Sequence, residues 1–149
     1  MQGSCKAVDN DEGMTCIELT ELADDQTTVD SFLAAVAAGG GIPVELYGPD
    51  ATLDATVPNW RFTVRGPEAI AAEYSRWFGF PGAFEELNRS PLPSGEVVTY
   101  LLTWTESGVP HAAHHCHVLT LGDDGRIASD VVFCGGVWPA GLLAEMAAS

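Results

Sequence analysis

The stretch that decides the fold runs from His114 to Cys134 and reads HHCHVLTLGDDGRIASDVVFC. It consists of two apolar runs, rich in β-branched residues, on either side of the turn sequence GDDG. Such a turn between two such runs predicts a β-hairpin, and pairing Leu121 with Arg126 sets the register of its strands. The segment therefore predicts two antiparallel strands that carry three histidines, two cysteines and one aspartate.

In that register His117 lies directly opposite Asp130, and His115 lies opposite Val132. Residues at positions i and i+2 of a strand share a face, so His115, His117 and Asp130 are expected to project together. A histidine can accept and donate protons near neutral pH, and an adjacent carboxylate fixes its tautomer. We therefore expect His117, Asp130 and His115 to be the catalytic residues if this face lines a pocket.

Composition restricts the class of protein. The chain has 149 residues, of which 46% are hydrophobic, and this suits one globular domain with a core. Six Lys and Arg against 21 Asp and Glu give a net charge of −15, which argues against nucleic acid, anionic membranes and strongly anionic substrates. The N-terminus has no basic region followed by an apolar stretch. We therefore expect no signal peptide, a cytoplasmic location and four reduced cysteines.

The chain divides into an acidic N-terminal extension and one domain. Residues 1–26 show little periodicity and are expected to be partly flexible, whereas residues 27–149 are expected to form the domain. Apolar spacing predicts one helix that begins at Thr28 and ends before Gly39, and a second that begins at Pro67 and ends before Gly79. A short helix is predicted over 43–47, extended segments over 53–57, 60–64, 84–88 and 97–105, and a terminal helical turn over 142–147. Helices followed by antiparallel strands predict an α+β fold.

Three motifs in this order resemble the nuclear transport factor two-like superfamily, which includes ketosteroid isomerase, limonene epoxide hydrolase and the SnoaL-like polyketide cyclases. They are LYGPDATLD at 46–54, RGPEAIAAEY at 65–74 and LGDDGRIASDVVF at 121–133. The resemblance covers residues 28–138. It implies a cone-shaped α+β fold, in which a curved antiparallel sheet wraps around N-terminal helices and encloses a central apolar pocket. This fold hosts isomerases, hydrolases, cyclases, dehydratases and non-enzymes, so it does not fix the function.

The resemblance also implies which hairpin residues face the pocket. His117 takes the position of the oxyanion-binding acid of ketosteroid isomerases. Asp130, Val132 and Cys134 take pocket-lining positions, and Tyr74 takes the position of a tyrosine on the second long helix.

The chain departs from the family at other catalytic positions. The general-base aspartate of ketosteroid isomerases falls at Ala55, with Asp54 one position away, and the tyrosine of their first helix falls near Ser31. Limonene epoxide hydrolases carry an arginine and an aspartate on the strand at 97–105. At the corresponding place this chain has Thr99, Tyr100, Thr103 and Trp104. Neither family mechanism is therefore predicted with its usual residues.

Aromatic side chains are expected to form the wall of the pocket and to suit a ring-containing ligand. The residues predicted to bind substrate are Tyr74, Trp77, Phe78, Tyr100, Trp104, Trp60, Val132 and Cys134. Core packing is the alternative role of the helical aromatic residues, and of Cys134. A purely structural pair is the alternative for His117 and Asp130. Together with His115 they also have the composition of a two-histidine, one-carboxylate metal site.

We expect a small-molecule enzyme of isomerase, cyclase, dehydratase or epoxide hydrolase type, acting on an apolar cyclic or polyketide-like substrate of secondary metabolism. Catalysis is expected to be acid–base chemistry without a cofactor or metal. His117 is expected to move the proton, Asp130 to orient it, and His115 or Tyr74 to stabilise an oxyanion or hold a water. Two alternatives remain open. One is a non-catalytic module that binds a small apolar molecule, and the other is a dimeric structural or interaction protein. Under each of these functions we expect a homodimer that forms through the convex sheet face.

Overall fold

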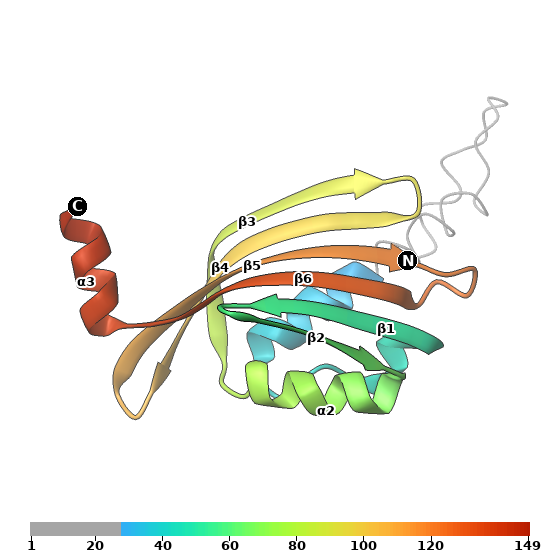
Figure 1. Cartoon of the computed structure of the whole chain (residues 1–149), viewed down its shortest axis with the longest axis horizontal. Coiled ribbons are helices and arrows are strands. Elements are labelled where there is room, and N and C mark those ends of the chain that lie inside the picture. Colours follow the sequence, from blue (N-terminus) through green and yellow to red (C-terminus); the bar gives the residue numbers. More distant parts are fainter. Residues whose placement is uncertain (1–27) are drawn as a thin grey trace, which may run out of the picture.

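The structure is a computed structural model that describes residues 28–149, and it contains one open, strongly curved sheet wrapped around helices (Figure 1). The strands are β1 (Tyr47–Val57), β2 (Trp60–Arg65), β3 (Gly82–Leu92), β4 (Gly95–Glu106), β5 (Val109–Leu121) and β6 (Ile127–Pro139). The helical segments are residues 28–38, the 3-10 helix η2 (Val44–Leu46), α2 (Pro67–Trp77) and α3 (Ala140–Ala148). The predicted α+β class and cone shape are confirmed. The predicted N-terminal extension, residues 1–26, lies outside the described range.

The sheet brings the predicted hairpin to its centre. The strand order is β2-β1-β6-β5-β4-β3, so β5 and β6 each have a neighbour on both sides. All neighbouring strands are antiparallel except β1 and β6, which are parallel. Side chains on the inner face of β5 and β6 are therefore enclosed by strands on both sides and by helices above.

The predicted hairpin forms, but its predicted register is wrong. The observed pairs are Leu121 with Ile127, Leu119 with Asp130, His117 with Val132, and His115 with Cys134. The turn is one residue longer on the β6 side, because the Gly122 amide donates to the Arg126 carbonyl at 2.8 Å. A β-bulge at Ala128 then shifts the pairing by one further residue. Two such shifts restore the side-chain parity, so the predicted inner face is preserved.

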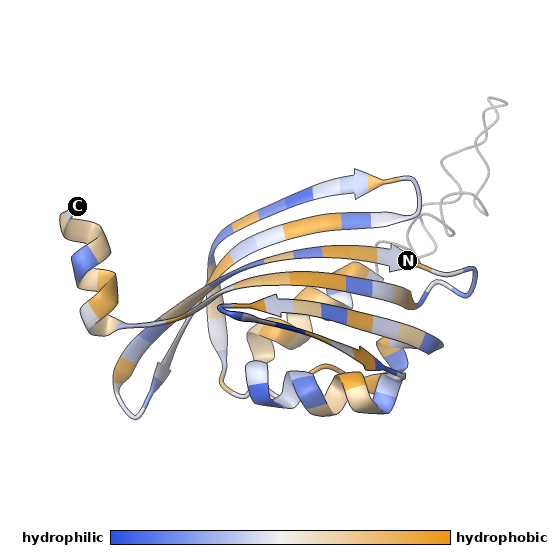
Figure 2. Ribbon diagram, viewed as in Figure 1, coloured by the Kyte–Doolittle hydropathy of each residue, from blue (hydrophilic) through white to orange (hydrophobic). Residues whose placement is uncertain are grey.

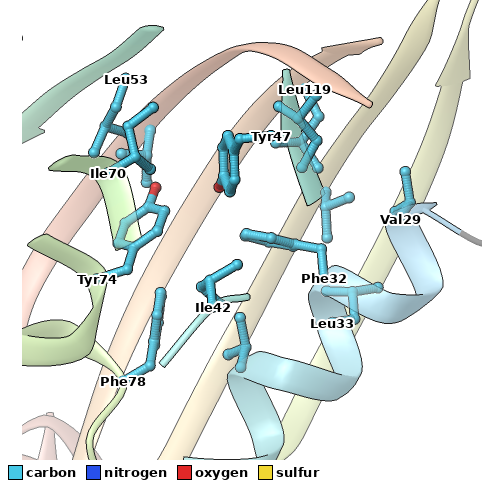
Figure 3. Close-up of a cluster of buried hydrophobic side chains, with 14 of the residues drawn as sticks. Val29, Phe32, Leu33, Ile42, Tyr47, Leu53, Ile70, Tyr74, Phe78 and Leu119 are labelled. Atoms are coloured by element: carbon cyan, nitrogen blue, oxygen red, sulfur yellow. The ribbon is translucent and has the colours of Figure 1, made fainter. Parts of the chain in front are cut away.

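The two main helices cover this inner face with apolar stripes. Residues 28–38 bury Val29, Phe32, Leu33 and Val36, and α2 buries Ile70 and Tyr74. Helix α2 begins where predicted, because Gly66 has a φ of 91° and Pro67 suits the first helical position. Figure 2 shows apolar and polar residues alternating along the strands, and Figure 3 shows side chains of both helices meeting those of the sheet.

Several elements differ in length from the prediction. Strand β1 begins at Tyr47 rather than residue 53, and the predicted short helix is confined to Val44–Leu46. The predicted terminal turn is the nine-residue helix α3, which buries none of its residues and lies at the end of β6, away from α2 (Figure 1). Between residues 28 and 149 no helix has both the length and the apolar character needed to span a bilayer.

Candidate active site

A cavity of about 540 Å³ opens between α2 and the strands of the inner sheet face. Its aromatic lining consists of Phe62, Trp77, Phe78, Phe80 and Trp104. Its polar lining side chains are Glu73, Arg76, Glu106, His115 and Cys134. The volume and the mostly apolar wall suit a small molecule with one or more rings.

The structure places some predicted site residues at this cavity and others below it. His115, Trp77, Phe78, Trp104 and Cys134 line the cavity, as expected. The predicted residues that lie below the cavity are His117, Asp130, Tyr74, Tyr100 and Val132, each with a relative exposure of 0%. The expectation that this second group lines the pocket is therefore wrong. The helices pack directly onto that part of the sheet and leave no space above it.

Trp60 does not contribute to the aromatic wall. It shares the parity of the cavity residue Phe62, but it lies two residues further out, at the turn end of β2. Its relative exposure is 70%. Trp60 therefore lies outside the cavity wall in which it was predicted.

Below the cavity, Asp130 is the centre of a buried hydrogen-bond network. Its Oδ2 accepts the hydroxyl of Tyr47 at 2.9 Å and that of Tyr74 at 2.8 Å. Its Oδ1 lies 3.0 Å from Nδ1 of His117. A buried carboxylate with three donors around it has the hydrogen bonds that an ionised group needs away from water.

Tyr100 links this network to the cavity. Its hydroxyl lies 3.0 Å from Nε2 of His117 and 3.0 Å from Nδ1 of His115. Both rings of the histidine pair thus contact one hydroxyl oxygen, on the strand next to theirs. A continuous chain of hydrogen bonds runs from Asp130 through His117 and Tyr100 to His115.

The other ring nitrogen of His115 faces the cavity. Nε2 of His115 has no hydrogen-bond partner in the part of the chain that the structure describes. Every fully buried polar side-chain atom in that part has a partner, so this nitrogen retains contact with solvent. Because His115 lines the cavity, that contact is made through the cavity. His115 is therefore the histidine that a bound molecule can touch.

Burial controls the protonation of these groups. It raises the pKa of the Tyr47, Tyr74 and Tyr100 phenols well above their ordinary value, and the charge of Asp130 adds to the effect. All three hydroxyls therefore keep their protons. Burial also lowers the pKa of His115 to about 3, with smaller contributions from His117 and His114, so this ring is neutral at pH 7.

Sequence reasoning missed Tyr47, which was assigned to the short helix. A signal for it exists, because Tyr47 has the same parity as the buried residues Ala51, Leu53 and Ala55. The glycine and proline that follow it obscured the start of the strand. Tyr100 was predicted only as an aromatic wall, and its bridging role follows from the pairing of β4 with β5, in which Tyr100 faces His115.

The remaining candidates have other surroundings. Asp54, which has the opposite parity to the buried Ala55, forms an exposed ion pair with Arg61. The pKa of the Cys134 thiol is raised, mainly by burial, so it stays in its protonated form. Within residues 28–149 no three His, Cys, Asp or Glu side chains are grouped so as to hold a metal ion. The two histidines and Asp130 do not converge on one point, because the Tyr100 hydroxyl lies between the rings.

Comparison with solved structures identifies the fold. A steroid delta-isomerase from Pseudomonas aeruginosa is 17% identical with a TM-score of 0.54, over 85% of this chain and 88% of that one. The epoxide hydrolase/cyclase-like enzyme SalBIII has a role in pyran ring formation in the polyether salinomycin. It is 16% identical with a TM-score of 0.59, over 80% of this chain and 98% of that one. A de novo designed protein, from a set with diverse pocket structures, is 15% identical with a TM-score of 0.56, over 76% and 98%.

At these identities the likeness establishes the fold and nothing finer. The chain shares its fold with these solved structures, and this agrees with the cone-shaped fold that its three motifs predicted. No protein-family model matches the chain, and no curated protein matches its sequence.

Proposed function

We propose that this chain is a small-molecule enzyme of isomerase or cyclase type, in which His115 exchanges a proton with an apolar substrate held in the cavity. The observation that supports this most strongly is the position of Nε2 of His115. It is a neutral imidazole nitrogen at the wall of an apolar cavity, and no side chain or backbone group among residues 28–149 bonds to it. A positioned imidazole in such surroundings is suited to general acid–base catalysis. Two of the solved structures that share the fold are an isomerase and a cyclase-like enzyme.

The proposal changes the roles expected from the sequence. His115 contacts the substrate, whereas His117 and Asp130 are positioning residues that act through Tyr100. The aromatic wall favours a cyclic or polyketide-like substrate. Glu73 is paired with Arg76 at the cavity wall, so Glu106, together with a net charge of −15, disfavours an anionic substrate. Dehydration or epoxide opening would use the same base.

The test uses 5-nitrobenzisoxazole, a flat, neutral and apolar carbon acid. A base removes the proton on C3, the electrons of that bond form the nitrile, and the N–O bond breaks to give a coloured nitrophenolate. We expect the wild-type chain to accelerate this elimination, and His115→Ala to lower the rate by about 10²- to 10⁴-fold. His114→Ala is the matched control, because His114 is the neighbouring histidine on the opposite, exposed face.

Three outcomes decide between the alternatives. Loss of elimination in His115→Ala but not in His114→Ala supports the enzyme. Equal rates in wild type and His115→Ala would overturn the assignment of His115. Quenching of tryptophan fluorescence by the probe without any elimination would favour the non-catalytic binding module.

A further inference from the structure

The geometry points to Tyr100 as a proton conduit, through which a proton taken up at His115 becomes a charge on His117 beside Asp130. This inference rests on the proposed function for the origin of the proton in the cavity. The tautomers of the two histidines and the direction of each hydrogen bond follow from the contacts of the resting protein, and they can be tested without any substrate.

The tautomer of His117 is set by Asp130. Both oxygens of this carboxylate act as acceptors, Oδ2 for two tyrosine hydroxyls and Oδ1 for the ring of His117. Nδ1 of His117 must therefore carry a proton. In the neutral ring Nε2 is then an acceptor, and the only donor within reach in the described network is the hydroxyl of Tyr100, at 3.0 Å.

The tautomer of His115 follows from the same count. The Tyr100 hydroxyl has one proton, which it donates to His117, so towards His115 its oxygen can only accept. Nδ1 of His115 must then carry a proton. Nε2 of His115 is left with a free lone pair facing the cavity, which makes it a base in the resting state.

Uptake of one proton reverses the two hydrogen bonds that Tyr100 makes with the histidines. Nε2 of His115 takes a proton from the cavity, and Nδ1 of His115 passes its own proton to the oxygen of Tyr100. Tyr100 passes its original hydroxyl proton to Nε2 of His117. The products are a neutral His115 protonated on Nε2, a neutral Tyr100, and a His117 imidazolium beside the Asp130 carboxylate. Three protons move, and no other bond is formed or broken.

This arrangement explains how a histidine in an apolar wall can accept a proton. Burial opposes an imidazolium at His115, whose pKa is lowered to about 3. Transfer through Tyr100 moves the charge to His117, where a carboxylate oxygen lies 3.0 Å away. His115 ends with a proton on the nitrogen that faces the cavity, so the same nitrogen can act first as a base and then as an acid. The titratable groups packed around the pair are Tyr47, Tyr74, Tyr100, His114, Cys134 and Asp130. Glu73, Arg76 and Glu106 line the cavity that His115 faces.

The wild-type chain, labelled with ¹⁵N-histidine, provides the main test by NMR. Near neutral pH we expect both His115 and His117 to be protonated on Nδ1 and free on Nε2. On acidification we expect His117 to become an imidazolium while His115 moves its proton from Nδ1 to Nε2 and stays neutral. A His115 already protonated on Nε2 at neutral pH, or one that keeps its Nδ1 proton when His117 is charged, would overturn the inference.

Two variants localise the effect. Tyr100→Phe removes the bridging hydroxyl, so the His115 tautomer should no longer respond to His117, and elimination of 5-nitrobenzisoxazole should fall by about 10²-fold. Tyr74→Phe is the matched control, because it removes an equally buried hydroxyl from Asp130 but leaves the path from His115 to His117 intact. Tyr74→Phe should keep the coupled switch, by which we mean the change of His117 to an imidazolium together with the move of the His115 proton from Nδ1 to Nε2. A switch that persists in folded Tyr100→Phe would contradict a role for Tyr100.

The two proposals fail in different ways. A coupled switch in a protein that does not eliminate the probe would retain the conduit and reject the enzymatic function. Elimination that depends on His115, without a coupled switch, would retain the function and reject the conduit. If Tyr100→Phe does not fold, the wild-type spectra alone decide the matter.

Discussion

His115 and His117 lie two residues apart on the same face of β5, yet they occupy different regions of the molecule. His117 has no exposed surface, both of its ring nitrogens are hydrogen-bonded, and the Phe32 ring lies edge-on at a centroid distance of 5.0 Å. His115 is 4% exposed and lies under Trp77 and Phe78 at the cavity. Within the described part of the chain it is hydrogen-bonded through Nδ1 alone. Identical side chains therefore belong to a closed polar network in one case and to an open reactive surface in the other.

The difference arises from what covers each histidine. The helix over residues 28–38 packs onto the part of the sheet that holds His117, whereas the aromatic end of α2 leaves space beside His115. A closed network must satisfy every polar atom, because water cannot do so. An open site can leave one atom for a ligand. We therefore expect changes in the closed region to affect stability first, and changes in the open region to affect protonation and binding.

The largest expected effect comes from removing Asp130, the centre of the buried hydrogen-bond network around His117. Asp130→Ala would leave two tyrosine hydroxyls and a histidine nitrogen without their acceptor at zero exposure. We expect a loss of about 3–5 kcal/mol in the free energy of unfolding, measured by urea denaturation. Asp54→Ala is the control, because that carboxylate forms an exposed ion pair with Arg61, and its loss should change stability little. Similar stabilities for the two variants would show that Asp130 is not the centre of the network.

At the cavity, His115 should make the free energy of unfolding depend on pH. The pKa of His115 is about 3 in the folded chain, against about 6.5 in an unfolded chain, so the unfolded state binds more protons between these values. Stability is then highest above pH 6.5 and is lost as the pH falls towards 3. The slope is at most about 1.4 kcal/mol per pH unit, which gives a loss of about 2 kcal/mol between pH 6.5 and pH 5.

Replacing the ring isolates this contribution. His115→Phe removes the titrating group and keeps an aromatic ring against Trp77 and Phe78, so its unfolding free energy should depend less on pH in this window. His114→Phe, on the exposed face, should change the slope much less, because His114 makes only a small contribution to the lowered pKa of His115. Equal slopes for wild type and His115→Phe would mean that His115 titrates normally in the folded chain.

The sequence was sufficient to predict which residues share the inner face of the sheet. It was not sufficient to predict which of these residues reach the cavity. Face depends on parity, and parity survived because the longer turn and the bulge at Ala128 each moved the register by one residue. The depth of His115 and His117 depends instead on where two helices end above the strand. No spacing in the sequence encodes that distance. Tyr47 was missed for a local reason, because Gly48 and Pro49 hide the start of its strand.

Sequence spacing also did not show which tryptophan lies at the cavity. This difference leads to the prediction with the smallest effect. Trp60 and Trp104 were both expected to form the aromatic wall, but only Trp104 lines the cavity. Its indole nitrogen donates to Glu106 at 2.8 Å, and the ring stacks on His111 at an interplanar angle of 18°. These contacts fix the Trp104 ring at the cavity, whereas Trp60 projects into solvent with 70% exposure.

We therefore expect Trp104→Ala to weaken the binding of a neutral aromatic ligand and Trp60→Ala to leave it unchanged. Loss of one aromatic contact of about 0.5–1.5 kcal/mol corresponds to a roughly 2- to 12-fold increase in Kd. The measurement is a fluorescence titration with the uncharged dye 6-propionyl-2-dimethylaminonaphthalene. Weaker binding in Trp60→Ala than in Trp104→Ala would place the ligand outside the cavity, and His115 would then no longer be the residue that meets it.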